Sequence, residues 1–213
     1  GVPYLIKDLS ELEGAPLTYG SKLFEHNVAD TDNGSVERAK QAGLVIIGKT
    51  NTPEFGFIST TESQLLGAAR NPYNTAYHTG GSSGGAGAAV AAGLVPFAHA
   101  SDGGGSIRIP ASVNGLVGLK PSRGRLYKRE PAQFEVDISV RLAVIRSVRD
   151  TAQILNASEV KGTDAALPPT GFVEGPSKKR LKIAFSTRPL TGGDAQADVR
   201  NATRRAAALC ADL

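Results

Sequence analysis

The sequence has 213 residues, which is enough for one large domain or two small ones. It is 40% hydrophobic and 21% charged, so the chain can bury a core and does not have the composition of a disordered protein. With a net charge of only +4, no long basic stripe and 6% aromatic residues, the sequence argues against a nucleic-acid-binding protein.

The cysteine and histidine content limits the chemistry further. Cys210 is the only cysteine, which excludes an internal disulfide framework and fits a reducing compartment, so we expect a cytoplasmic protein. The three histidines (His26, His78 and His99) and one cysteine provide no metal-ligand spacing, and we expect no metal and no cofactor. No apolar run is long enough to cross a membrane, so no membrane partner is expected.

The first half of the chain alternates strand and helix signals. Val2–Ile6 is predicted to be a short strand, and residues 10–34 are predicted to be irregular because turn-forming residues recur there. Ser35–Ala42 has a helical pattern, with Asp32 or Ser35 as its cap and Gly43 as its stop. Leu44–Ile47 is a continuous apolar run, which is typical of a strand buried on both faces.

A phosphate-binding loop is a second way to interpret this junction, because Gly43–Thr50 matches the pattern G-x-x-x-x-G-K-[ST]. The residues between the two glycines are strand formers, however, and Asn51-Thr52-Pro53 follows in place of a continuous helix. A strand cannot also wrap around phosphates, so we do not expect nucleotide binding.

Further elements follow in the same alternation. A loop is predicted for residues 51–78 with a helical turn near Pro53–Gly56, followed by the helix Ala86–Ala92 and the strands Leu94–Ala100 and Leu116–Leu119. The polar stretch Ser122–Ile145 is predicted to be a solvated excursion.

The last third is predicted to contain a helix from Ser147 through Leu155, a linker over Gly162–Ser177, a strand over Leu181–Ser186 and an amphipathic helix over Ala195–Leu213. This alternation predicts an α/β fold with a mixed, largely parallel central sheet covered by helices. The chain opens in a strand and closes inside a helix, which we interpret as a fragment of a longer protein.

Two glycine-serine clusters carry the candidate chemistry. Cluster 1 is Gly80–Gly85, cluster 2 is Gly103–Ser106, and an apolar, Ala-rich stretch separates them. Ser106 follows three glycines after a predicted strand, so its hydroxyl lies among unhindered N–H groups that can stabilise an oxyanion. A serine nucleophile also needs a base.

Two residues are candidates for that base. His99 falls inside a predicted strand and lacks the Gly-x-Ser-x-Gly elbow that accompanies many Ser-His-Asp sites, so it is more simply a packed histidine. Lys7 ends an apolar strand, where burial lowers the pKa of an amine. Ser82 or Ser83 could then bridge Lys7 to Ser106, although spacing alone does not establish the contact.

These clusters resemble the signature of the amidase signature family, G-G-S-S-G-G followed by an Ala/Gly-rich segment and D-x-G-G-S-[IV]-R-x-P. The stretches that carry the resemblance are Gly80–Gly85, Asp102–Pro110, Gly1–Asp8, Gly48–Glu54, Arg70–Pro72, Gly118–Gly124 and Arg146–Asp150. The first nine residues are most similar to bacterial amidases of the 6-aminohexanoate-cyclic-dimer hydrolase type. The resemblance implies one α/β domain over residues 1–213, truncated at both ends.

The resemblance also implies site residues and an activity. The family's Ser-cisSer-Lys triad falls on Ser106 as nucleophile, Ser82 as bridge and Lys7 as base, for hydrolysis of amide C–N bonds through an acyl-serine. The oxyanion hole would be formed by the N–H groups of Gly103, Gly104, Gly105 and Ser106. Ser83 would orient rather than react, and Asp102 and Arg108 would form an internal structural pair.

The expected partner is a small-molecule amide substrate, and a homodimer is an expected assembly. Two other functions stay open at this point. One is the A-type subunit of a glutamine-dependent amidotransferase, which would co-purify with partner subunits. The other is a catalytically inactive fragment, since family members are about twice this length.

Overall fold

The computed structural model describes residues 1–213 except 127–137, 177–178, 190 and 213. Its contacts divide the chain into two compact units, Gly1–Glu174 and Gly175–Leu213, which we treat separately. The expectation of a single domain over residues 1–213 stays a prediction. In the described part of the chain, no helix combines the length and the apolar character that crossing a bilayer requires.

A parallel strand pair opens the first unit. β1 (Val2–Lys7) lies beside β2 (Leu44–Thr50), with Val2 opposite Leu44 and Lys7 opposite Thr50. Residues 44–50 are thus one continuous strand, which agrees with our rejection of a phosphate loop. The prediction that this strand is buried on both faces is wrong: Val45 and Ile47 are 52% and 58% exposed.

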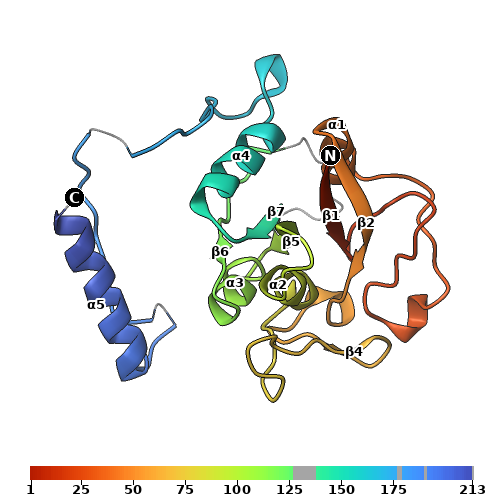
Figure 1. Cartoon of the computed structure of the whole chain (residues 1–213), viewed down its shortest axis with the longest axis horizontal. Coiled ribbons are helices and arrows are strands. Elements are labelled where there is room, and N and C mark those ends of the chain that lie inside the picture. The colour runs from red at the N-terminus through yellow and green to blue at the C-terminus, as the bar shows by residue number, and fades with distance from the viewer. Residues whose placement is uncertain (127–137, 177–178, 190, 213) are drawn as a thin grey trace. The chain divides into compact units, whose positions relative to one another are not determined.

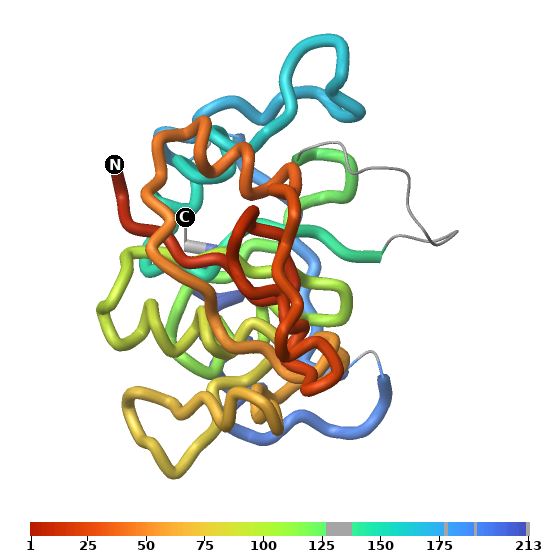
Figure 2. Tube along the Cα trace, turned by 90° about the vertical axis from the view of Figure 1, so that its right-hand side faces the viewer, coloured from red at the N-terminus to blue at the C-terminus, as the bar shows by residue number. Residues whose placement is uncertain are grey.

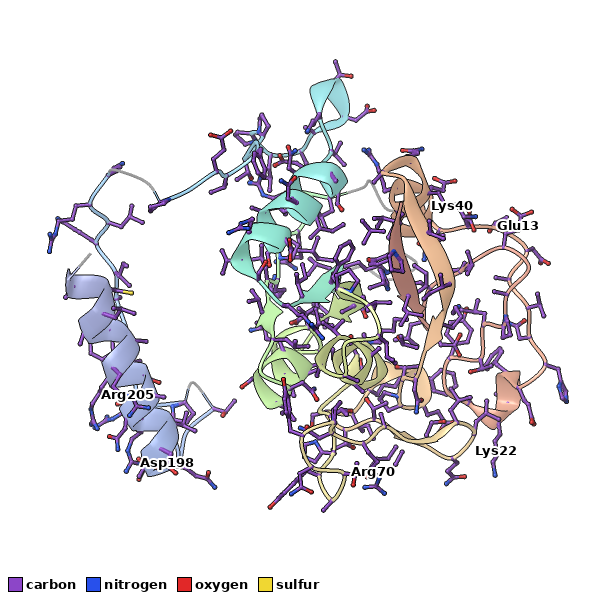
Figure 3. All side chains as sticks on the ribbon, in the orientation of Figure 1. Glu13, Lys22, Lys40, Arg70, Asp198 and Arg205 are labelled. Carbon is purple, nitrogen blue, oxygen red and sulfur yellow. The ribbon has the colours of Figure 1, made fainter. Side chains whose placement is uncertain are left out.

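Helix α1 (Gly34–Gln41) connects these two strands. Its cap is Asn33, whose side-chain oxygen accepts hydrogen bonds from the N–H groups of Ser35 and Val36, so the prediction of Asp32 or Ser35 as the cap is wrong. The carboxylate of Asp32 instead accepts hydrogen bonds from the backbone of Glu13 and from Lys40, both labelled in Figure 3. Asp32 therefore fastens the preceding loop to the helix.

The second sheet of this unit is antiparallel and has the strand order β5-β7-β6. Its strands are β5 (Phe97–Asp102), β7 (Val140–Ile145) and β6 (Val117–Gly118). β5 begins three residues later than predicted. The mixed α/β architecture of the prediction is confirmed, with β1–β2 as the parallel pair.

β7 corrects the sequence interpretation of Ser122–Ile145. Residues 140–145 are not a solvated excursion but the middle strand of the sheet, and Leu142 through Ile145 are buried. Polar residues before this short apolar run concealed it. Residues 127–137 of the same prediction lie outside the described residues.

Helices cover this second sheet (Figure 1). α2 (Gly84–Ala91) packs against β5, α3 (Arg108–Val113) against β6 and β7, and α4 (Val148–Ser158) against β7. α2 begins two residues before the predicted helix, and α4 extends three residues beyond its predicted end. The shared core is made mostly of alanine and β-branched side chains, which suits helices lying close to a sheet.

Short elements complete the first unit. They are three 3-10 turns (Lys22–Phe24, Glu54–Gly56 and Gly162–Asp164) and the two-residue strands β3 (Glu62–Ser63) and β4 (Gly67–Ala68). The turn at Glu54–Gly56 agrees with the predicted helical turn, whereas the β3–β4 hairpin was not predicted. The loop containing the hairpin, orange to yellow in Figure 2, runs along one end of the unit before the chain enters α2.

The second unit contains helix α5 (Ala197–Asp212), from which Asp198 and Arg205 project in Figure 3. The predicted strand at Leu181–Ser186 is wrong, because these residues form no ladder with any other described residue. Leu181, Ile183 and Phe185 are each more than 60% exposed. The alternation is that of a strand, but a strand also requires a hydrogen-bonding neighbour.

Candidate active site

Strand β1 delivers a lysine into the interior of the first unit. Ile6 and Lys7 are both fully buried at its carboxyl end. The amine Nζ of Lys7 lies 2.6 Å from the hydroxyl oxygen of Ser82 and 3.1 Å from that of Ser101. Lys7 therefore meets Ser82, one of the two serines that could form the predicted bridge.

Burial changes the acid–base character of this amine. Desolvation is the main cause that lowers the pKa of Lys7 from 10.5 to about 7. The positive charge of Arg141 lowers the pKa further, whereas the negative charge of Asp102 opposes the shift. A large fraction of Lys7 is thus uncharged at neutral pH, and an uncharged amine can accept a proton.

Ser82 lies in cluster 1, just before helix α2. It is 2% exposed, and the peptide bond that joins it to Gly81 is cis. A β-carbon at Gly81 would lie 2.6 Å from the backbone oxygen of Thr60, so the chain approaches this loop too closely for any side chain. The glycine next to Ser82 is therefore required by packing.

Ser83 contacts backbone rather than the amine. Its hydroxyl donates to the carbonyl oxygen of Ser101 and accepts from the N–H of Ser101, with both distances at 3.3 Å. The side chain is fully buried. This arrangement suits the orienting role expected for Ser83.

Asp102 organises the loop of cluster 2. Its carboxylate accepts hydrogen bonds from the backbone N–H groups of Gly105 and Ile107, at 2.8 and 3.2 Å, and from the guanidinium of Arg108 at 2.9 Å. Burial alone would raise the pKa of Asp102, but these hydrogen bonds lower it overall. The structure therefore contains the expected Asp102–Arg108 pair, but the pair is not internal on both sides: Asp102 is buried, whereas the Arg108 side chain is 52% exposed.

Ser106 closes this loop, immediately before Ile107 and α3, and is half-buried. The N–H of Gly105 donates to Asp102 and is not free for an oxyanion. The expected oxyanion donors are therefore the N–H groups of Gly103, Gly104 and Ser106. Among the described residues no hydrogen bond joins the hydroxyls of Ser106 and Ser82. The structure thus brings Lys7 and Ser82 into contact and places Ser106 on a fixed loop outside that contact.

His99 is a packed histidine. It is 2% exposed on β5, and its Nε2 lies 3.3 Å from the hydroxyl oxygen of Ser35. Burial, together with the charges of Arg141, Lys7 and Lys49, lowers its pKa well below the usual value. His99 is therefore neutral and makes its contact away from both glycine-serine clusters.

Ser101 is the site residue that sequence reasoning missed. It lies on β5, five residues before Ser106, and its hydroxyl is the second partner of Lys7. The signal was present in the sequence as a hydroxyl at the end of a strand that leads into cluster 2. Within the ranges that the structure describes, no group of three or more His, Cys, Asp and Glu side chains gathers as a metal site.

Comparison with known proteins finds relatives of this chain. The sequence matches the family Amidase over residues 1–213. AmiC of Mycobacterium bovis, a putative amidase by its name, is 46% identical over 214 residues, which cover all of this chain and 45% of AmiC. The chain thus spans about half the length of the curated relatives that it matches.

Two solved structures are also similar. One is a 6-aminohexanoate cyclic dimer hydrolase complexed with substrate, with 39% identity and a TM-score of 0.82, covering 99% of this chain and 46% of that one. The other is the A-type subunit of the Glutamyl-tRNA(Gln) amidotransferase from Thermotoga maritima, with 36% identity and a TM-score of 0.71, covering 78% of this chain and 36% of that one.

Proposed function

Since the chain belongs to the amidase family, we propose that the protein hydrolyses carboxylic amide C–N bonds through an acyl-serine intermediate. The observation that carries the proposal is the fully buried amine of Lys7, 2.6 Å from Ser82 and with its pKa lowered to about 7. Burial of a lysine costs stability when the amine is charged, so a buried lysine is expected at a site whose chemistry needs an uncharged amine.

The first half of the reaction acylates Ser106. Lys7 takes the proton of the Ser82 hydroxyl while Ser82 takes that of Ser106, and the Ser106 oxygen attacks the amide carbonyl carbon. The N–H groups of Gly103, Gly104 and Ser106 hold the oxyanion of the tetrahedral intermediate. The C–N bond then breaks, and the proton stored on Lys7 returns through Ser82 to the leaving amine.

The second half repeats the relay with water. Water loses a proton through Ser82 to Lys7 and attacks the ester carbonyl carbon of the acyl-enzyme. The ester C–O bond then breaks, the proton returns from Lys7 through Ser82 to the Ser106 oxygen, and a carboxylic acid is released. Ser82 and Ser106 are not hydrogen-bonded to each other in the structure. Catalytic hydrogen bonds often tighten only when the substrate binds, so we expect this contact to form in the complex.

The proposed substrate class is supported by the similar proteins. The hydrolase that acts on a cyclic dimer is similar over 99% of this chain, whereas the amidotransferase subunit is similar over 78%. We therefore propose a small-molecule amide substrate in preference to a glutamine-dependent amidotransferase subunit. The cytoplasmic location and the homodimer stay predictions from the sequence. Purification of an ammonia-transferring complex with partner subunits would favour that alternative.

The test is hydrolysis of a set of simple amides by the full-length protein and its Ser106→Ala variant. We expect the wild type to release amine, to form the hydroxamic acid when hydroxylamine competes with water, and to lose at least about 1,000-fold in rate with Ser106→Ala. Full amide turnover by the folded variant would exclude Ser106 as the nucleophile. The inactive-fragment alternative predicts no turnover by the 213-residue chain alone.

A further inference from the structure

The amine of Lys7 has two hydroxyl partners, and the proposed relay uses only one of them. Ser82 lies at 2.6 Å and Ser101 at 3.1 Å. In the described part of the chain these two hydroxyls are the hydrogen-bond partners of Nζ. Ser101 comes from β5 and not from either glycine-serine cluster, so it meets Lys7 from a separate element.

The contact with Ser101 affects the direction in which an uncharged Lys7 amine can accept a proton. Uncharged Nζ has two N–H bonds and one lone pair, and rotation about the Cε–Nζ bond decides where the lone pair points. The amine accepts a proton from Ser82 only when the lone pair faces the Ser82 hydroxyl. An N–H donated to the oxygen of Ser101 excludes the rotation in which the lone pair points at Ser101, and the Ser82 hydroxyl, as donor, then selects the rotation in which the lone pair faces Ser82.

Ser101 is itself held in place. The Ser83 hydroxyl contacts both the N–H and the carbonyl oxygen of Ser101 at 3.3 Å. Ser83 follows Ser82 in the chain, so the contacts form a closed ring that runs from Ser82 to Lys7, to Ser101, to Ser83 and back through the peptide bond. A displacement of one member therefore alters the separation of the amine from Ser82.

From this ring we propose that Ser101 is a positioning residue that aims the neutral amine of Lys7 at Ser82. The inference rests on the proposed amide hydrolysis and adds a fourth side chain to its proton relay. Ser101 makes no contact with the reacting carbonyl in this role. It acts through Lys7, and Ser83 acts through Ser101.

The kinetic test compares Ser101→Ala with Ser101→Thr in the full-length protein. Ser101→Ala removes the hydroxyl, so we expect kcat to fall by about 10- to 100-fold with KM within about twofold. Ser101→Thr keeps a hydroxyl at the same position, so kcat should return to within about threefold of the wild type. If both variants lose kcat equally, or if Ser101→Ala loses none, the inference is wrong.

A second readout needs no activity and separates this inference from the proposed function. The Ser101 oxygen accepts a hydrogen bond from the charged amine, so its removal lowers the pKa of Lys7 further. The stability lost in Ser101→Ala, measured by urea unfolding, should then be larger at pH 6 than at pH 10. In a Lys7→Met background the loss caused by Ser101→Ala should be the same at both pH values. A stability loss of Ser101→Ala that does not depend on pH would overturn the inference, even if amide hydrolysis is confirmed. A pH-dependent stability loss together with failed hydrolysis would overturn only the proposed function.

Discussion

The buried amine of Lys7 determines at which pH the proposed site works. Its pKa near 7 makes activity rise through neutrality, because the protonated form cannot accept the proton of Ser82. Arg141 is the charged neighbour that lowers this pKa, and Asp102 is the one that raises it. These two side chains therefore tune the relay, although neither is a hydrogen-bond partner of the amine.

Replacing Arg141 tests this electrostatic coupling. Arg141→Met removes a positive charge and should raise the pKa of Lys7, so the acid limb of the kcat profile moves to higher pH by a few tenths of a unit to about one unit. Arg141→Lys keeps the charge and serves as the control, with a smaller shift. A limb that moves to lower pH in Arg141→Met would contradict the assignment of the limb to Lys7.

Burial of Lys7 also links stability to pH. The folded-state pKa, about 7, is below the unfolded value of 10.5, so the unfolded chain binds the extra proton between these values and stability rises with pH across that range. Lys7→Met lacks this group. We expect the difference in free energy of unfolding, variant minus wild type, to be larger at pH 7 than at pH 10 by about 3–5 kcal/mol. This figure comes from about 1.4 kcal/mol per pKa unit.

Chemical denaturation at several pH values measures this difference. The hydrogen bonds lost to Ser82 and Ser101 lower the stability of the variant at every pH, so the diagnostic quantity is the change with pH. A difference between variant and wild type that stays constant from pH 7 to pH 10 would mean that Lys7 is not a desolvated amine.

Among the elements, helix α2 holds the site because glycines let it lie against neighbouring backbone. A β-carbon at Gly85 would lie 2.5 Å from the backbone nitrogen of Asn51, an atom that cannot move aside as a side chain can. The start of α2 therefore approaches the segment after β2 closely, and this approach places Ser82 and Ser83 next to Lys7.

Gly85→Ala should therefore destabilise the protein by about 2–4 kcal/mol, which equals or exceeds the usual cost of overpacking a core. Gly48→Ala is the matched control, because a β-carbon there meets only Leu5 Cδ2 at an ordinary 3.5 Å and should cost less than about 1 kcal/mol. Thermal unfolding of both variants gives the comparison. Equal losses would mean that the close approach of α2 is not a real constraint.

The sequence predicted those elements that carry their own local signal. Ala-rich residues 86–91 favour a helix by propensity, and Ser147 caps α4 through its own hydroxyl. β7 could not be predicted because a run as short as Val140–Ile145 becomes a strand only when β5 and β6 pair with it. The segment Leu181–Ser186 failed in the opposite way, since its alternating pattern has no partner strand among the described residues.

At the scale of the whole molecule, the site assembles residues that are far apart in the sequence. Lys7, Ser82 and Ser101 come from β1, the loop before α2 and β5, and only packing of these elements brings them together. Motif resemblance could point to Lys7 and Ser82 because their motifs are distinctive. No motif marked Ser101, whose role depends on a contact across 94 residues of sequence.

In the proposed mechanism, uncharged Lys7 activates Ser106 through Ser82. Its most direct test is the rate at which a fluorophosphonate probe labels the full-length protein as a function of pH, with peptide mapping of the adduct. We expect a single adduct on Ser106, a labelling rate that rises through a midpoint near pH 7, and a loss of labelling by at least about 100-fold in Lys7→Met. An adduct on another residue, or labelling of Ser106 that is unaffected by Lys7→Met, would contradict it.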